Sequence, residues 1–142
     1  MARSFTLVRV MTIFGVPAWR FVLLVLAAEL APILVLVLAM FFVGTAQGGQ
    51  PSQATASAWG AWIGPIFGAL FTGFFAYRLA RGSNRPGAFG LAFGVSVAML
   101  DLGLIATQGA PFQWLFAVSA MSRLVSGWVG GRMAQRRNRA AV

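Results

Sequence analysis

Residues 21–43 read FVLLVLAAELAPILVLVLAMFFV, an apolar run long enough to cross a lipid bilayer as one helix. A membrane-spanning helix needs about 20 apolar residues to cover roughly 30 Å of hydrocarbon. Glu29 is the only charged residue in this run. Further apolar runs follow it, so we predict an all-α polytopic membrane protein with a single four-helix transmembrane domain over residues 1–142. The predicted spans are residues 21–43, 59–77, 86–107 and 111–131.

The composition agrees with a membrane protein and narrows the possible functions. Hydrophobic residues make up 59% of the 142 residues and charged residues 9%, whereas a soluble domain has roughly 25% charged residues. The chain has no Cys and no His, which removes thiol chemistry, the most common metal ligand and the most common general base. We therefore expect a non-enzymatic protein with no catalytic residue, no metal site and no cofactor.

The arginines predict the orientation of the chain in the membrane. Every arginine except Arg123 lies outside the predicted spans, and the loops at residues 44–58 and 108–110 carry no charge. Because arginine concentrates in cytoplasmic loops, both termini are expected in the cytoplasm. The arginines before the first span and between the second and third are Arg3, Arg9, Arg20, Arg78, Arg81 and Arg85.

The two ends of the chain outside the spans have different predicted roles. Residues 132–142 form a basic cytoplasmic tail, and its position directly after the last span favours contact with anionic phospholipid over binding of nucleic acid. Its arginines are Arg132, Arg136, Arg137 and Arg139. Residues 4–16 mix apolar side chains with Arg9, which fits a short interfacial helix that ends at Pro17 or an irregular cytoplasmic extension. The first span is expected to be an uncleaved anchor, since it is too long for a signal peptide.

Small residues recur every four positions in three of the predicted spans. Such spacing lets helix backbones approach closely, which is how helices associate in lipid. The run in the second span continues through Thr72 and Ala76, so this span is also a candidate face for a homodimer. The predicted packing glycines are Gly60, Gly64, Gly68, Gly90, Gly94, Gly127 and Gly131.

An internal repeat is a further interpretation of the helix order. Shifting the sequence by 54 residues aligns residues 70–85 with residues 124–139, with identities that include Gly73 with Gly127 and Arg78 with Arg132. Each half would then be a helical hairpin, and both hairpins would run in the same direction through the membrane. The alternative is that membrane helices with arginine-rich ends resemble one another by composition alone.

Glu29, Asp101 and Arg123 are the charged residues inside the predicted spans. Charges in lipid are costly, so such residues face a bundle interior, a cavity or a partner. At about 1.5 Å per residue, Glu29 and Arg123 both lie about 18 Å below the outer boundary, and Asp101 about 9 Å below it. We therefore predict a buried Glu29–Arg123 pair, with Asp101 either sharing Arg123 or protonated.

This charge cluster has three interpretations. In the first it locks four helices into one arrangement. In the second one carboxyl exchanges a proton or binds a cation, as in a small transporter. In the third it docks the chain onto another membrane subunit.

The C-terminal half resembles a loose group of uncharacterised small four-helix bacterial membrane proteins. The resemblance lies in residues 73–80 (GFFAYRLA), in Gly87, Gly90 and Gly94, and in residues 127–131. It implies a four-helix architecture and a bacterial cytoplasmic (inner) membrane, and it implies no activity. We expect a structural or accessory subunit that acts through helix contacts in a homo-oligomer or larger complex, with a proton- or cation-linked transporter as the alternative.

Overall fold

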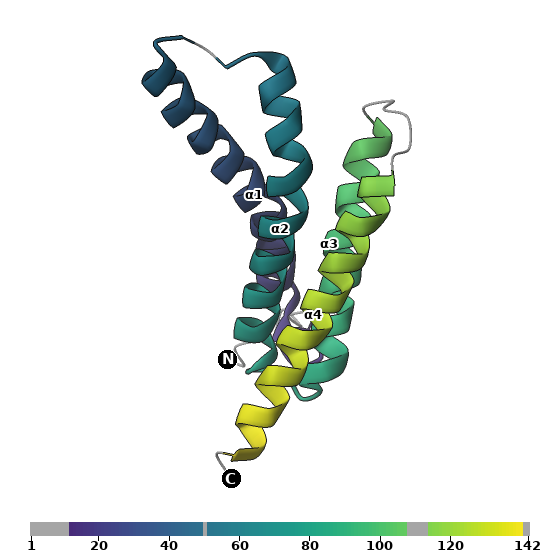
Figure 1. Ribbon diagram of the computed structural model, residues 1–142. Helices are drawn as coiled ribbons and strands as arrows, with labels where there is room; N and C mark the ends of the chain where they lie inside the picture. The colour runs from purple at the N-terminus through teal and green to yellow at the C-terminus, as the bar shows by residue number, and fades with distance from the viewer. Residues whose placement is uncertain (1–11, 50, 108–113, 141–142) are drawn as a thin grey trace, which may run out of the picture.

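The computed structural model describes residues 12–49, 51–107 and 114–140. In these residues the chain forms two very short strands followed by four long helices that alternate in direction (Figure 1). The strands β1 (Thr12–Ile13) and β2 (Val16–Pro17) pair antiparallel. The helices are α1 (Ala18–Gln47), α2 (Gln53–Ala80), α3 (Pro86–Thr107) and α4 (Trp114–Ala140). The prediction of a helical protein is confirmed.

Three helices of the described chain are long and apolar enough to cross a membrane. They correspond to the first three predicted spans, and α3 has the predicted bounds. The helices α1 and α2 extend beyond their apolar runs, because Gly48 ends α1 in the left-handed conformation at φ 71° and the Ser52 hydroxyl caps α2 at the Thr55 N–H. The described part of α4 does not reach the same apolar content, since Arg123 and several serines interrupt it.

The prediction for the helix α4 can be compared with the structure only at its C-terminal end. Pro111, where the sequence predicts the start of the helix, lies outside the described residues, as do Gln108 and the rest of the short loop. At the other end the helix continues through residues 132–140, past the predicted end at Gly131. The arginines, glutamine and alanines there favour helix once a helix is under way. The basic segment is therefore the last part of α4, as far as the structure describes it.

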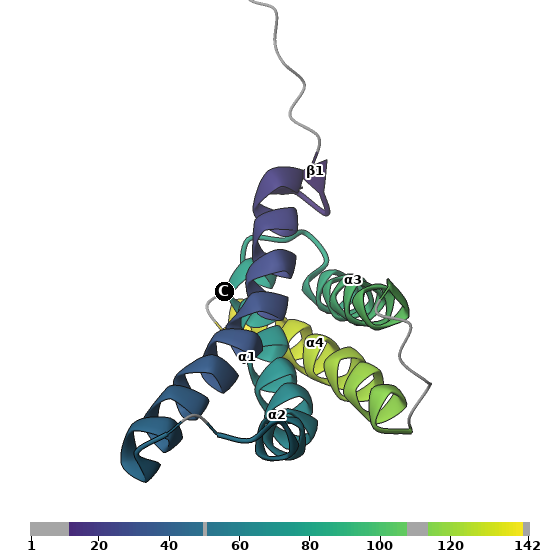
Figure 2. The ribbon, with the colours of Figure 1, turned by 90° about the horizontal axis from the view of Figure 1, so that it is seen from above.

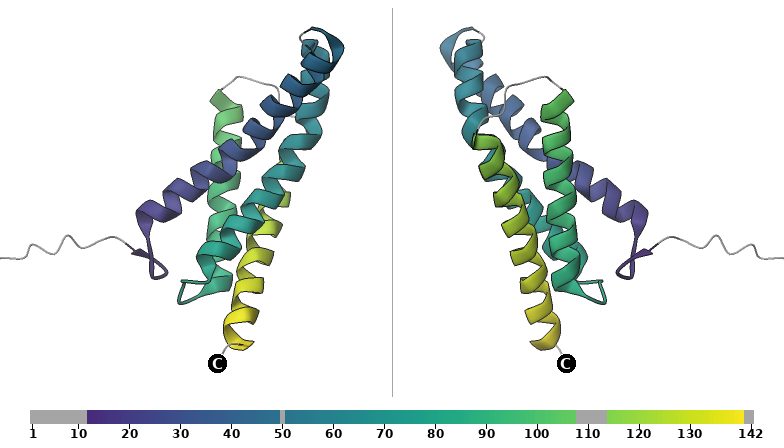
Figure 3. Two further views of the ribbon diagram at one scale, coloured as in Figure 1. Left: turned by 90° about the vertical axis from the view of Figure 1, so that its left-hand side faces the viewer. Right: turned by 90° about the vertical axis from the view of Figure 1, so that its right-hand side faces the viewer.

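Two helix pairs diverge toward one end of the molecule. Figure 1 shows α1 and α2 spreading away from α3 and α4 toward the Gly48–Ser52 connection. Viewed from above, α1 runs across α2 rather than along it, and the side views show its incline (Figures 2 and 3). The end opposite the divergence holds the α2–α3 loop, the N-terminal hairpin and the C-terminal part of α4, and we call it the basic end. The arginines of this end are Arg20, Arg78, Arg81, Arg85, Arg132, Arg136, Arg137 and Arg139.

The helices α3 and α4 approach each other closely through glycines. A Cβ added to Gly94 would lie 2.8 Å from the Arg123 carbonyl oxygen, and one added to Gly127 would lie 2.7 Å from the Gly94 Cα. Gly90 and Gly131 face each other in the same way, one helical turn away. The backbones touch along this contact, so four of the predicted packing glycines pack against one another here.

The helix α2 turns its small residues toward the inside of the chain. Gly68, Thr72 and Ala76 are buried, and Gly73 of α2 packs against Gly130 of α4. This part of the helix is therefore closed to a second copy, which contradicts a homodimer face along the whole run. Nearer the divergent end, Gly60 lies 3.5 Å from Leu36 of α1, measured from an ideal Cβ, and Gly64 has no atom within 4 Å.

The N-terminal hairpin occupies the position where an interfacial helix is one of the predictions. Phe14 and Gly15 have φ values of 49° and 85°, which makes the tight two-residue turn of a hairpin. The turn is held from far along the chain, because the Asn84 N–H and the Ser83 hydroxyl both donate to the Phe14 carbonyl, at 3.1 and 3.0 Å. The helix prediction is wrong for residues 12–16, and residues 4–11 lie outside the described part of the chain.

An aromatic core joins this hairpin to the helices. Phe21 of α1 makes edge-to-face contacts with Phe89 and Phe93 of α3, at 5.6 Å between ring centres in both cases. Phe14 contacts Phe89 in the same manner at 6.4 Å. Such pairs add to the energy of burying the rings. Aromatic rings thus join α1 to α3, whereas α3 and α4 meet through glycines.

Candidate functional site

The structure brings Glu29, Asp101 and Arg123 together from three helices. The Arg123 Nη2 lies 3.3 Å from Glu29 Oε2 and 3.4 Å from Glu29 Oε1. The Arg123 Nη1 forms an ion pair with Asp101 Oδ2, which is the closer of its two acidic partners. The Ser119 hydroxyl, one turn before Arg123, donates to the same Asp101 oxygen at 3.1 Å. One guanidinium thus joins α1, α3 and α4.

Small residues on the neighbouring helices make room for the guanidinium. Gly68 of α2 lies directly against it, since a Cβ there would be 2.9 Å from both Nε and Nη2 of Arg123. Gly94 of α3 lies against the Arg123 backbone. The glycine positions and the charge cluster are therefore parts of one arrangement.

The cluster is buried and its charges do not balance. Arg123 is 2% exposed and Glu29 6% exposed. One arginine faces two carboxyl groups, so the cluster carries a negative charge when both are ionised. The Arg123 Nε has neither a hydrogen bond nor an ion pair among the described residues. Burial of this kind makes each partner depend on the others, because a charge left alone at this depth is costly.

A cavity of about 250 Å³ reaches one side of the cluster from between α2, α3 and α4. Asp101, Ser119 and Arg123 are among its lining residues, whereas Glu29 is not. Ala61 and Pro65 of α2 also line it. A proline has no N–H to offer the carbonyl four residues earlier, so the Ala61 carbonyl lacks its usual partner. The Asp101 carboxyl, the Ser119 hydroxyl and the Arg123 guanidinium therefore share this cavity with apolar residues such as Ile105 and Leu115.

The arginines predicted to contact lipid lie exposed at the basic end. The Arg132 guanidinium lies over the Trp128 ring at 5.3 Å, and Arg137 donates to the Tyr77 hydroxyl at 2.8 Å. Arg136 and Arg139 are exposed on the same stretch of α4. These side chains surround the end of the helix rather than forming one pocket.

Several residues of the site are not among the sequence predictions. Ser119 and its bond to Asp101 are not predicted, and Gly73 and Gly130 fall outside the four-residue spacing that identified the other glycines. Arg20 and Arg78 were assigned only to the topology signal, and the structure places both at one cavity. Their signal in the sequence is that arginines greatly outnumber acids, which leaves most arginines without an acidic partner.

Comparison with known proteins finds no similar protein. No protein-family model matches the chain, and neither a curated protein nor a solved structure matches it. The geometry of the described residues is consequently the basis for the function that follows.

Proposed function

We propose that this chain is an integral protein of the bacterial cytoplasmic membrane with four membrane-spanning helices, α4 being the fourth. The proposal is supported by the position of α4 beside α3. The two helices touch near the basic end through Gly90 and Gly131, and they meet again at the Asp101–Arg123 ion pair. A helix that lies along a membrane-spanning neighbour over this length shares its depth. The arginines then lie on the cytoplasmic side.

Single-cysteine labelling tests this topology, because the chain contains no Cys. We expect a membrane-impermeant maleimide to label the variant Gly49→Cys in intact cells, since Gly49 lies at the divergent end and is exposed. The variants Arg81→Cys and Arg139→Cys are expected to react only after permeabilisation. Labelling of Arg139→Cys but not Arg81→Cys in intact cells would contradict a fourth span.

We further propose that the protein is a non-enzymatic structural or accessory subunit. The observation that carries this proposal is the half of α1 after Pro32. The helix there leaves α3 and α4 (Figure 1) and presents large apolar side chains outward, such as Leu34 at 60% exposed and Phe41 at 64% exposed. A cavity of about 600 Å³ lies between this half of α1 and the start of α2, and Val37, Met40 and Phe41 are among the residues that line it. A helix with so little support from its own chain favours packing against another helix in lipid.

Native mass spectrometry of the gently extracted chain tests the subunit proposal. We expect another membrane polypeptide in fixed stoichiometry, and we expect the double variant Leu34→Ala/Phe41→Ala to lose it. The matched control is Met99→Ala/Met121→Ala on α3 and α4, where the side chains are 66% and 59% exposed. A chain found alone, a homo-oligomer without another subunit, or equal loss in both variants would count against an accessory role.

A proton- or cation-linked transporter is the second candidate, and the cavity beside Asp101 favours it. An exchangeable carboxyl needs a path to water. This cavity offers such a path, since Asp101 is among its lining residues. In liposomes we expect a proton or cation flux that Asp101→Asn abolishes and Arg139→Gln leaves unchanged. Absence of flux from the unaltered protein would exclude this candidate under the conditions tested.

A further inference from the structure

A third cavity, of about 580 Å³, lies at the basic end between α1 and α2. Arg20 of α1 and Arg78 of α2 stand at it, and the N-terminal hairpin closes one side. Its apolar wall comes from Leu24, Phe75 and Leu79. The cavity therefore has a cationic part and an apolar part, and it is separate from the charge cluster in the middle of the helices.

Among the residues that the structure describes, the two arginines have no carboxylate partner. The chain contains two acidic residues, and both are engaged by Arg123. The described contacts of Arg20 and Arg78 are with aromatic rings instead, the guanidinium carbons lying 5.2 Å from the Trp19 ring centre and 6.0 Å from that of Phe74. An anion from outside the chain is the complement that these positions lack.

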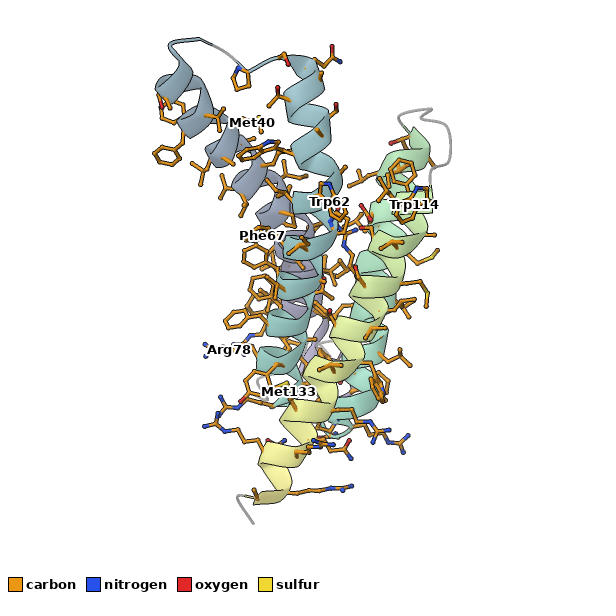
Figure 4. The ribbon with its side chains drawn as sticks, viewed as in Figure 1. Met40, Trp62, Phe67, Arg78, Trp114 and Met133 are labelled. Atoms are coloured by element: carbon orange, nitrogen blue, oxygen red, sulfur yellow. The ribbon has the colours of Figure 1, made fainter. Side chains whose placement is uncertain are left out.

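An aromatic ladder runs along α2 away from these arginines. The rings of Phe67, Phe71 and Phe75 follow one another at 6.3 Å between centres. Figure 4 shows Phe67 and Arg78 on the same side of α2, with Arg78 nearer the basic end. The ladder offers a continuous apolar surface that starts where the charged groups end.

We propose that this cavity binds one anionic phospholipid, with its phosphate between Arg20 and Arg78 and an acyl chain along Phe75 and the ladder above it. Basic pockets between membrane helices near the cytoplasmic side suit such headgroups. A free phosphate would leave the apolar wall of the cavity uncovered. A zwitterionic lipid would place its own cationic group beside the two arginines, which disfavours its binding. The site is distinct from the exposed arginines of α4, and only its assignment to the cytoplasmic leaflet rests on the topology proposed above.

Native mass spectrometry of the full chain in detergent, titrated with phosphatidylglycerol, tests the site. We expect one tight lipid, and we expect Arg20→Gln/Arg78→Gln to weaken it about 30-fold, since an interfacial arginine contributes about fivefold. The matched control Arg81→Gln/Arg85→Gln removes the same charge at two exposed positions at the end of α2 and in the α2–α3 loop, and it should keep the tight lipid. The variant Arg20→Lys/Arg78→Lys should retain most of the affinity, which separates charge from folding. Leu79→Trp, which fills the apolar wall without changing charge, should also expel the lipid.

Several outcomes would overturn the site. Equal weakening in both glutamine variants would assign the effect to net charge alone. Equal retention of phosphatidylcholine, or displacement of the lipid by inorganic phosphate at low concentration, would show that the site does not select an anionic phospholipid. Because the cysteine labelling described above reads topology independently, failure of the lipid site and failure of the four-span proposal are distinguishable.

Discussion

Replacing Arg123 with alanine is expected to lower the free energy of unfolding by about 3–5 kcal/mol. The substitution leaves the Glu29 and Asp101 carboxyl groups buried between the helices without the arginine that pairs with them. Arg123 is 2% exposed, so solvent screens the lost interaction little. Thermal or detergent-induced unfolding, followed by tryptophan fluorescence, measures the effect. The control is Arg139→Ala at the exposed end of α4, which we expect to change stability by less than about 0.5 kcal/mol.

A triple substitution separates a structural lock from a functional cluster. In Glu29→Gln/Asp101→Asn/Arg123→Met all three charges are gone, so no charge is buried alone. Replacing a complete buried ion group with neutral side chains of similar size is often neutral or stabilising. We therefore expect the triple variant to recover most of the stability that Arg123→Ala loses. Recovery of stability together with loss of partner binding or ion flux would assign the cluster a role beyond holding the helices. A triple variant no more stable than Arg123→Ala would contradict the ion-pair account.

Much of the helical architecture is predictable because lipid demands long apolar runs. The bounds of α3 follow directly from Pro86 and the end of its apolar residues. The same rule fails at the ends of α1, α2 and α4, where polar and basic residues continue a helix that is already formed. The N-terminal hairpin could not be predicted from the residues that form it. Its turn is fixed by Ser83 and Asn84, about 70 positions along the chain, and those contacts exist only after α2 folds back.

The charge cluster is predicted in part from the depth of each residue along its helix. Placing residues at a fixed rise along parallel helices brings Glu29 level with Arg123, and the structure has that ion pair. The same counting sets Asp101 well above Arg123, yet Asp101 is the closer partner. The two backbones keep close to the counted depths, because Gly94 of α3 lies against the Arg123 backbone. The long arginine side chain spans more than one turn and so reaches Asp101. The sequence does not give the direction of that side chain.

Replacing Gly127 with alanine should destabilise the protein by about 3 kcal/mol, the upper part of the range for overpacking a close contact. The added Cβ would lie 2.7 Å from the Gly94 Cα and 2.8 Å from the Gly94 N. Both are backbone atoms, so α3 and α4 must move apart and no side chain can rotate away to relieve the contact. Gly64→Ala is the matched control, because nothing lies within 4 Å of its added Cβ. We expect that control to stay within about 0.5 kcal/mol of the unaltered protein. Equal effects of the two substitutions would contradict the packing described for α3 and α4.

The losses of stability caused by Arg123→Ala and by Gly127→Ala are also expected to be non-additive. Gly127 lies one turn after Arg123, and Gly94 contacts the Arg123 backbone directly. Separating α3 from α4 at Gly127 therefore draws Arg123 away from Asp101 and weakens the ion pair as well as the packing. When two residues share a contact in this way, the effects of replacing them are coupled, typically by about 0.5–3 kcal/mol. The double variant Arg123→Ala/Gly127→Ala should consequently lose less stability than the sum of the single variants. Additive losses in the unfolding experiment would mean that the glycines and the ion cluster stabilise the helix pair independently.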